Sequence, residues 1–469
     1  MTPDPILHAF ELLARRDPLA PLVVSPERRA AVGDVDALAR AAGQTLAKAG
    51  LPPGAVVGLA AANGPGFLAS FLAVRRAGLA ALLLDAQTPD AEALRIVRAL
   101  GAAALLRCRT GWPGGPGDWE WTGTDDASLH PPHPPDTAVV KLTSGSTGLP
   151  RGIATPSSAL LADDAALTAS MGLRPDDRFL TTIPLSHSYG LSSLTVPALV
   201  RGAVLVLPEA KSVYDPFATA ERTGATFFPT VPAHLDALVR MAEPPPLPAA
   251  LRLVITAGAP LSAATSERFR EIFGLPVHVF YGASECGGIC YDREGGAAER
   301  GTVGAPVEGV RIDLDEENGV TVSSPAVAAG YVPEGDPRLG DGRFRASDLA
   351  TWKDGELALS GRVDDLVNIK GKKVNPREIE AVIGGLPGVV EVAVLGVRIP
   401  GRPAEILRAV IACPPGRVAA EDVVAWCREH LSAHKVPRSV LLVPELPRTP
   451  RGKLDRPALR ALTSDTARG

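Results

Sequence analysis

The 469-residue sequence predicts an α/β protein with a large N-terminal domain of stacked α/β sheets, a small β-rich subdomain and a small α+β C-terminal domain. Three observations predict this fold. Helix-like and strand-like apolar segments alternate through about residue 300, short strands with tight turns follow, and the last hundred or so residues have a pattern of their own. A chain of this length exceeds what one hydrophobic core supports, so two or more domains are expected.

Helix and strand patterns alternate near the N-terminus. Residues 36–50 place apolar side chains at helical spacing and stop at a glycine, and residues 55–61 read as a buried strand. Residues 67–85 and 92–107 each run from a helix into a strand. Such alternation is typical of an α/β sheet. The Pro-, Gly- and Trp-rich stretch 110–136 then interrupts the pattern, and we expect it to be a surface connection.

The strand pattern resumes beyond this connection. Further strands are expected at 138–142, 203–207, 225–231, 251–258 and 277–282. Residues 310–324 and 350–362 then look like short antiparallel strands, with turns at Asn318-Gly319 and Asp354-Gly355. This change from alternating helices and strands to short antiparallel strands predicts the small β-rich subdomain.

The C-terminal region predicts a compact α+β domain. Its expected order is helix 376–386, strand 390–397, strand 405–413, helix 420–431 and strand 439–446. A boundary near Asp364 follows, and it divides the chain into domains 1–363 and 364–469.

Composition excludes several classes of protein. Lys and Arg number 48 against 52 Asp and Glu, a net charge of −4, which gives no basic footprint for nucleic acid. Five cysteines without paired metal-ligand spacing fit a reducing compartment. The N-terminus lacks a signal-peptide pattern, and no stretch reaches the roughly 18 apolar residues of a membrane span. A cytoplasmic location is expected.

One loop has the composition of a phosphate site. The segment 141–153, KLTSGSTGLPRGI, follows a strand directly, which a flexible surface linker rarely does. Glycines permit a tight backbone, while amides and hydroxyls donate hydrogen bonds and a guanidinium offers positive charge. The G-x-x-x-x-G-K-[ST] spacing of P-loop NTPases is absent. The predicted phosphate ligands are Thr143, Ser144, Gly145, Ser146, Thr147, Gly148 and Arg151.

Six further motifs follow in a fixed order along the chain. They are PLSHSYG (184–190), ITAGAPL (255–261), YGASE (281–285), RFRASD (343–348), GRVDDLVNIKGKKVNPREIE (361–380) and LPRTPRGKLDR (446–456). With the loop, they make the chain resemble the adenylate-forming superfamily of acyl-CoA synthetases, adenylation domains and luciferases over almost its whole length. The chain departs from the family pattern in four places: Arg151 replaces a lysine, Ala346-Ser347 replaces Thr-Gly, Lys370 replaces a small residue, and His434 replaces an aromatic residue.

The resemblance implies a nucleotide site. Tyr281, followed by Gly282, would stack on adenine, Gly258 and Ala259 would line its edge, and Ser284 would contact the α-phosphate. Glu285 would hold Mg²⁺, for which a hard carboxylate oxygen is suited. Asp348 would accept the ribose hydroxyls and Arg362 would lie near the ribose and phosphate.

The resemblance also implies a mobile C-terminal domain. Lys453 matches the catalytic lysine that neutralises charge in the adenylation transition state. Asp364 matches the hinge about which the domain rotates. Lys370, Gly371 and Lys372 would then lie on the path of the thiol, although these basic side chains are equally well interpreted as ordinary surface charges.

The expected acid pocket consists mostly of small or apolar residues. The stretch 184–195 has no aspartate to pair with a substrate ammonium, so an acid without an α-amino group is preferred. His187 would lie beside the carboxylate and the thiol tunnel; the alternative is a packed core imidazole. The predicted pocket residues are His187, Ser188, Tyr189, Phe228, Gly258, Gly282 and Gly287.

Three functional hypotheses remain. The first is a ligase that uses ATP, Mg²⁺ and CoA to make acyl-AMP and then acyl-CoA, favoured because the C-terminal unit is complete and no carrier domain follows Gly469. The second is a stand-alone enzyme that loads an acid onto the phosphopantetheine of an acyl carrier protein. The third is a non-catalytic nucleotide-binding relative. The chain length and aromaticity of the acid, and the oligomeric state, are left open.

Overall fold

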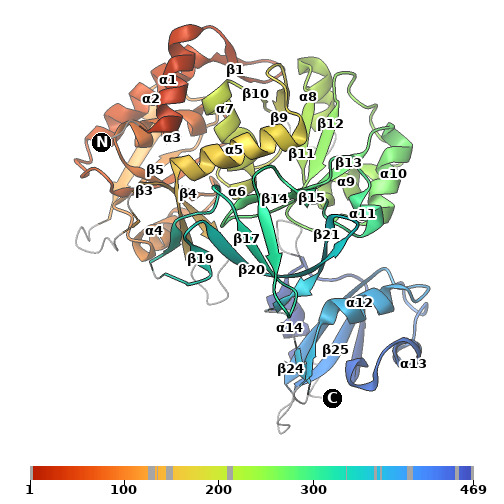
Figure 1. Ribbon diagram of the computed structural model, residues 1–469. Helices are drawn as coiled ribbons and strands as arrows, with labels where there is room; N and C mark the ends of the chain where they lie inside the picture. The colour runs from red at the N-terminus through yellow and green to blue at the C-terminus, as the bar shows by residue number, and fades with distance from the viewer. Residues whose placement is uncertain are drawn as a thin grey trace. The chain divides into compact units, whose positions relative to one another are not determined.

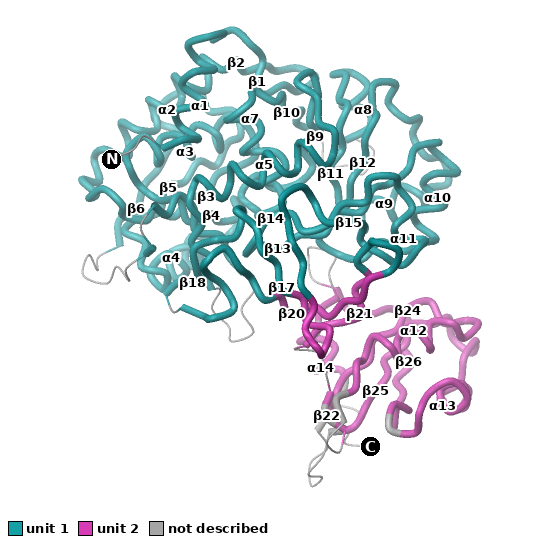
Figure 2. The backbone as a smooth tube through the Cα atoms, in the orientation of Figure 1, with its two compact units in different colours: residues 1–313, 321–345, 353–357 teal, residues 314–320, 346–352, 358–469 magenta. Residues whose placement is uncertain are grey.

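The computed structural model describes residues 4–124, 133–134, 136–143, 151–208, 215–333, 335–363, 367–369, 372–398, 405–448 and 454–465. The chain forms two compact units (Figure 2). The first unit comprises residues 1–313, 321–345 and 353–357, and the second comprises 314–320, 346–352 and 358–469. The domain boundary expected near Asp364 stays a prediction. Among the described residues, no helix is long and apolar enough to cross a membrane.

A seven-stranded sheet lies in the first unit. In sheet order its strands are β18 (Gly330–Val332), β8 (Arg151–Pro156), β7 (Thr137–Thr143), β4 (Ala80–Leu84), β3 (Val56–Ala61), β5 (Ala104–Cys108) and β6 (Trp119–Gly123). The four central strands pair in parallel, and the outer strands pair antiparallel. The central strands are almost wholly apolar because both of their faces are covered.

Strand β6 corrects one expectation. The stretch 110–136 was expected to be a surface connection, yet Trp119–Gly123 pairs with β5 as an edge strand. Trp119 is buried, and its indole N–H donates to Ser70 Oγ at 2.8 Å. The alternation of Trp119 and Trp121 carried this strand signal, but the surrounding proline and glycine obscured it.

A nine-stranded sheet is the other large sheet of the first unit (Figure 1). In order it contains β15 (Ala305–Pro306), β14 (Gly287–Tyr291), β13 (Val277–Ala283), β12 (Leu253–Thr256), β11 (Phe227–Thr230), β9 (Arg178–Leu180), β10 (Val204–Val206), β1 (Pro21–Val24) and β2 (Arg29–Ala31). The inner strands are parallel, and β2, β14 and β15 are antiparallel. Every strand expected between residues 203 and 282 is present, which confirms the α/β interpretation.

Helices cover these sheets. They are α1 (Pro5–Arg16), α2 (Val32–Ala47), α3 (Pro65–Arg76), α4 (Asp90–Ala99), α5 (Ser157–Met171), α6 (Ser188–Gly190), α7 (Val196–Arg201), α8 (Asp215–Thr223), α9 (Pro232–Val239), α10 (Ala263–Phe273) and α11 (Ala297–Arg300). Helix α2 begins before the expected residue 36 because the Asp34 carboxylate accepts the Ala31 N–H at 2.8 Å and caps the first turn. One apolar cluster joins the two sheets, since it contains Leu59 and Val139 of one and Phe227 and Ile255 of the other.

A smaller antiparallel sheet confirms the predicted β-rich subdomain. Its strands are β16 (Arg311–Leu314), β17 (Gly319–Ser323), β20 (Arg343–Lys353) and β19 (Leu339–Gly340), with β21 (Glu356–Arg362) paired to β20. Asn318, at φ 64°, and Asp354 and Gly355, at φ 51° and 81°, make the two expected turns. Only residues that tolerate positive φ fit such tight hairpins.

The C-terminal part of the second unit has the predicted order of elements. It contains the hairpin β22 (Val367–Ile369) and β23 (Lys372–Val374), then α12 (Pro376–Gly384), β24 (Glu391–Arg398), β25 (Glu405–Ala412), α13 (Ala420–His430), β26 (Ser439–Val443) and α14 (Arg456–Asp465). Strands β24, β25 and β26 form a three-stranded sheet. Ile379, Ile411 and Val423 lie in a core separate from those of the first unit, as expected for an independent α+β domain.

Candidate active site

The expected phosphate loop joins two paired strands. Thr143 of β7 lies opposite Arg151 of β8, and the Thr143 hydroxyl donates to the Arg151 carbonyl at 3.4 Å. Gly152 lies between β7 and β18, where a Cβ would come within 2.6 Å of Val140 and Val332. Glycine is therefore required for the three strands to pack. Ser144, Gly145, Ser146, Thr147 and Gly148 lie outside the described residues, and their roles stay predictions.

The Arg151 guanidinium contacts Tyr331 and Asp336. It lies 4.0 Å from the ring centroid of Tyr331, and its Nη1 is 3.1 Å from Asp336 Oδ2. Arg338 also pairs with Asp336, at 2.8 Å. The Arg338 guanidinium, with Arg151 beside it, holds the pKa of Asp336 well below its ordinary value. Arg151 thus faces a carboxylate that stays ionised to a lower pH than an ordinary aspartate does.

Tyr331 connects this arginine to Glu285. The Tyr331 hydroxyl donates to Glu285 Oε1 at 2.8 Å. Burial, with the negative charge of Glu285 beside it, raises the pKa of Tyr331 above its ordinary value, so the hydroxyl stays protonated and donates. The Ala328 N–H also donates to the Glu285 carbonyl, at 2.8 Å. The segment around β18 therefore ties the loop strand β8 to the YGASE motif.

The YGASE motif lies in the hairpin of β13 and β14. The register shifts between Tyr281 and Gly282, and a Cβ at Gly282 would come within 2.7 Å of the Gly287 carbonyl. The Ser188 hydroxyl donates to Ser284 Oγ at 2.8 Å. Ser284, the predicted α-phosphate ligand, is thereby linked to the PLSHSYG loop.

Two buried charges that we did not predict lie beneath this hairpin. Asp163 of α5 is 3% exposed and accepts the Gly288 N–H at 2.9 Å. A Cβ at Gly287 would meet Asp163 Oδ1 at 2.3 Å. Lys141 of β7 is 4% exposed. Burial raises the pKa of Asp163 and lowers that of Lys141, and the opposite charges of the two residues act against both shifts. The available signal was a charge inside the apolar strand AVVKL and another inside an apolar helix.

The PLSHSYG loop is held by a further residue that we did not predict. Asn63 follows β3, donates to the Ile183 carbonyl at 3.0 Å and accepts the Leu185 N–H at 2.9 Å. His187 Nε2 lies 3.5 Å from Asp85 Oδ2. Because 29% of its side chain is exposed, His187 is not the packed core imidazole that we considered as an alternative. A polar residue two positions after the end of a parallel strand was the signal for Asn63.

Other residues of the predicted acid pocket differ in burial. Tyr189 packs against Phe280 with ring centroids 5.7 Å apart, and burial raises its pKa well above the ordinary value. Phe228 is fully buried and packs edge-on against Phe217 and His234, so its side chain lies in the apolar core.

The predicted adenine contacts lie at one edge of the nine-stranded sheet. Gly258 and Ala259 follow β12 and are exposed. Gly258 has φ 85°, and no atom of the described residues lies near the position that a Cβ would take there. Tyr281 lies near the end of the adjacent parallel strand β13. The carboxyl ends of neighbouring parallel strands meet at a common edge, which is where ligands bind in such sheets.

The predicted ribose residues belong to the second unit. Arg362 Nε lies 3.6 Å from Asp348 Oδ1, and half of the arginine side chain is exposed. Lys372 begins β23 opposite Ile369. Asp364, Lys370, Gly371 and Lys453 lie outside the described residues, and their roles stay predictions.

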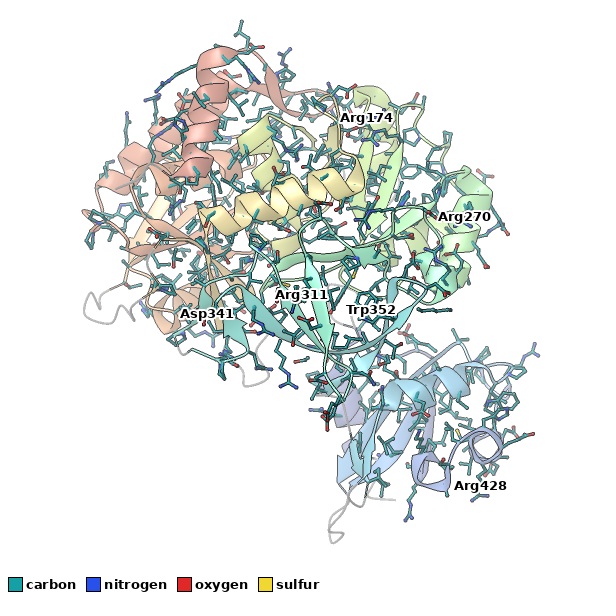
Figure 3. The ribbon with its side chains drawn as sticks, in the orientation of Figure 1. Arg174, Arg270, Arg311, Asp341, Trp352 and Arg428 are labelled. Carbon is teal, nitrogen blue, oxygen red and sulfur yellow. The ribbon has the colours of Figure 1, made fainter. Side chains whose placement is uncertain are left out.

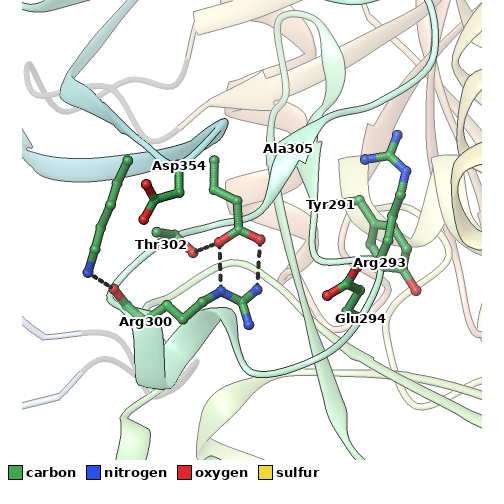
Figure 4. Close-up of a pocket in the computed structure, with 9 residues that line it drawn as sticks. Tyr291, Arg293, Glu294, Arg300, Thr302, Ala305 and Asp354 are labelled. Carbon is green, nitrogen blue, oxygen red and sulfur yellow. Dashed lines mark hydrogen bonds and ion pairs between the residues drawn. The ribbon is translucent and has the colours of Figure 1, made fainter.

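A cavity of about 350 Å³ lies elsewhere in the first unit, between β14 and the turn at Asp354 (Figure 4). Its charges are largely paired: both Glu356 oxygens accept from Arg300, at 2.7 and 2.9 Å, and Lys353 Nζ donates to the Arg300 carbonyl at 2.7 Å. Arginines on the surface also pair locally: Arg270 and Arg311, both labelled in Figure 3, form ion pairs with Glu299 and Asp313 respectively. None of the predicted site residues that the structure describes lines this cavity.

Comparison with known proteins identifies the class. The family model described as AMP-binding enzyme matches residues 10–332, and that described as AMP-binding enzyme C-terminal domain matches residues 378–453. The feruloyl-CoA synthase of Amycolatopsis sp is 30% identical over 456 residues, covering 87% of this chain and 89% of the relative. The oxalate–CoA ligase of Arabidopsis thaliana is 30% identical over 468 residues, covering 90% and 91%.

Solved structures agree on the fold. ATP-bound MatB from Rhodopseudomonas palustris has a TM-score of 0.82 at 24% identity, covering 98% of this chain and 99% of that one. The amide bond synthetase McbA from Marinactinospora thermotolerans has a TM-score of 0.80 at 25% identity, covering 98% and 100%. The chain therefore belongs to the acyl-CoA synthetases and ligases of the adenylate-forming superfamily. By this membership it is an ATP-dependent ligase that activates a carboxylic acid and forms a CoA thioester.

Proposed function

We propose that this chain converts a small carboxylic acid without an α-amino group into its acyl-adenylate where β8 and β18 of the seven-stranded sheet lie beside the hairpin of β13 and β14, and then transfers the acyl group to CoA. The observation that carries the proposal is the connected path from Arg151 through Tyr331 to Glu285, with distances of 4.0 Å and 2.8 Å. A positive charge beside a phosphate loop and a carboxylate suited to a metal thus lie within one unit.

Glu285 is the proposed magnesium ligand. Its Oε1 accepts one hydrogen bond from Tyr331, and among the described residues Oε2 makes none. The described part of the chain contains no group of three or more His, Cys, Asp or Glu residues that could hold a metal. Magnesium is commonly bound by one or two carboxylates together with substrate phosphates and water, so a single Glu285 fits it. When bound, the ion offsets charge on the phosphates.

The other side chains have proposed roles in binding and orientation. Arg151 would exchange Asp336 for the phosphates that leave as pyrophosphate, since a guanidinium binds two oxygens in one plane. Ser284 would donate to the α-phosphate in exchange for its contact with Ser188. Asp348 and Arg362 would hold the ribose. Lys453 would then neutralise the charge that develops between the attacking carboxylate and the α-phosphate.

We propose that the second half-reaction follows rotation of the C-terminal domain about Asp364. The thiol would then pass Lys370, Gly371 and Lys372, and His187 would lie beside the reacting carboxyl group. Two conformations let one site perform both half-reactions in turn.

The preference for an acid without an α-amino group rests on the pocket. The stretch 184–195 contains no acidic residue to pair with an ammonium. Ferulate and oxalate, after which two relatives are named, also lack an α-amino group.

ATP–pyrophosphate exchange with a panel of aliphatic, aryl and dicarboxylic acids tests the proposal. We expect exchange with at least one acid and thioester formation when CoA is added. A carrier protein in place of CoA tests the alternative acceptor. Exchange with no acid would favour the non-catalytic relative, and exchange only with amino acids would contradict the pocket assignment.

A further inference from the structure

Tyr331 lies where three functional segments meet. It pairs with Ile153 in the antiparallel register of β18 and β8, and the next pair is Val332 with Gly152. Side chains alternate along a strand, so Arg151 and Ile153 point to the same face, and Tyr331 reaches Arg151 diagonally. The missing side chain at Gly152 allows β18 to pair this closely.

The aromatic ring and the hydroxyl of Tyr331 contact different partners. The ring lies 4.0 Å from the Arg151 guanidinium carbon, and the hydroxyl donates to Glu285 Oε1 at 2.8 Å. The residue is 8% exposed, so its two side-chain torsions are fixed by packing. A rigid side chain with two such contacts sets the distance between a cation and a carboxylate.

Asp336 completes the arrangement from the other side of Arg151. It pairs with Arg151 at 3.1 Å and with Arg338 at 2.8 Å. Because Arg338 remains as its partner, Asp336 can release Arg151 to a phosphate without being left as an unpaired charge. We call Arg151, Tyr331, Asp336 and Glu285 the phosphate-side cluster.

We propose that Tyr331 is a positioning residue that fixes the phosphate-binding Arg151 and the metal-binding Glu285 relative to each other before ATP binds. This inference rests on the proposed function for its purpose, but its physical content is a coupling between side chains of the free protein. It also accounts for the arginine at position 151: a planar guanidinium stacks on an aromatic face, and an ammonium has no such plane.

Two substitutions separate the contacts of Tyr331. Tyr331→Phe keeps the ring and removes the donor, whereas Tyr331→Leu removes both. Mn²⁺ binding to the enzyme–ATP complex without acid, followed by electron paramagnetic resonance, reports on Glu285. Calorimetric ATP binding without metal reports on Arg151. Tyr291→Phe is the matched control, because Tyr291 is also buried and lies outside the phosphate-side cluster.

We expect Tyr331→Phe to weaken Mn²⁺ binding about tenfold, as loss of a partner behind a metal ligand typically does, and to leave metal-free ATP affinity unchanged. Tyr331→Leu should in addition lower metal-free ATP affinity about threefold, because the stacked guanidinium is released. Tyr291→Phe should match the wild type in both measurements. Wild-type Mn²⁺ affinity in Tyr331→Phe would overturn the inference.

A double-mutant cycle in urea makes the test independent of ATP. If the two substitutions acted independently, their separate effects on the unfolding equilibrium constant would multiply in the double variant Tyr331→Phe/Glu285→Ala. We expect the measured constant to differ from that product at least about threefold, because the two residues are in contact. Additive effects would overturn the inference even if the enzyme turns over. The cycle could instead show coupling in a protein that fails to exchange pyrophosphate with every acid tested. That result would leave the inference standing and would contradict only the proposed function.

Discussion

The interior pair of Lys141 and Asp163 and the phosphate-side cluster both place charges beside the YGASE hairpin, but their surroundings differ. Asp163 is buried and accepts a backbone N–H of the hairpin, Gly288. Arg151 is one-third exposed, and its guanidinium contacts the side chains of Tyr331 and Asp336. A buried charge bound to backbone holds a structure, whereas a partly exposed charge can change partners. Substitutions in the interior pair should therefore affect stability, and those in the phosphate-side cluster should affect catalysis.

The largest expected effect is that of Asp163→Ala. It removes the acceptor of the Gly288 N–H and the charge opposite Lys141, so we expect the free energy of unfolding to fall by about 3–5 kcal/mol. Urea unfolding measures this, with the exposed Asp176→Ala as the control. Lys141→Met combined with Asp163→Asn should recover part of the loss, because both buried charges are then gone. A loss no larger than that of the control would remove the distinction between the two clusters.

The pH dependence of stability sharpens the same point. Burial raises the pKa of Asp163, so between the unfolded pKa of 3.8 and the higher folded pKa the native state binds more protons than the unfolded state. The contribution of Asp163 to the free energy of unfolding must therefore fall as pH rises through this window. Asp163→Asn should flatten that part of the stability curve, and an unchanged slope would contradict the assignment.

Gly287→Ala should have the next largest effect. The residue has φ 70°, and an added Cβ would meet the Asp163 carboxylate at 2.3 Å. Backbone strain and overpacking together should cost about 3 kcal/mol. Thermal unfolding measures the loss, and Gly274→Ala, at φ 69° with no atom near the Cβ position, controls for backbone strain alone. Equal losses for the two variants would show that contact with Asp163 is unimportant.

Arg151→Lys tests the phosphate-side cluster. Lysine keeps the charge but loses the planar stack on Tyr331, so we expect kcat/KM for ATP to fall about tenfold. The free energy of unfolding should change by less than about 1 kcal/mol, because the pair with Asp336 is partly exposed. Steady-state kinetics and urea unfolding on the same preparation check both expectations. A stability loss as large as that of Asp163→Ala would place Arg151 with the structural charges.

Asp336→Asn should have the smallest effect and the opposite sign on binding. It removes the carboxylate that competes with phosphate for Arg151, so KM for ATP should fall about twofold to threefold. Asp313→Asn, which breaks the surface pair with Arg311, is the control and should leave KM unchanged. A rise in KM would show that Asp336 orients Arg151 for ATP rather than withholding it.

The sequence predicted the elements whose signal is local. The parallel strands are apolar runs, and the turns at Asn318 and Asp354 require residues that tolerate positive φ, so both could be predicted. Strand β6 could not, because the alternation of its tryptophans lies within a Pro- and Gly-rich stretch.

The residues of the site also divide into those with a local sequence signal and those without one. Motifs marked Glu285, Ser284 and Arg151, whereas Lys141 and Asn63 have roles that depend on tertiary neighbours. Lys141 lies in β7, and its charge partner Asp163 lies in α5. Asn63 hydrogen-bonds residues more than a hundred positions away. Tyr331 was missed for the same reason, since its two contacts come from β8 and the YGASE hairpin.

The central claim is that this chain activates its acid with ATP at the proposed site and that Lys453 completes the adenylation step. Measuring the two half-reactions separately in Lys453→Ala tests this most directly. We predict that acid-dependent ATP–pyrophosphate exchange is abolished, while thioester formation from supplied acyl-AMP and CoA is largely retained. Equal loss of both half-reactions, or full exchange activity without Lys453, would contradict the account.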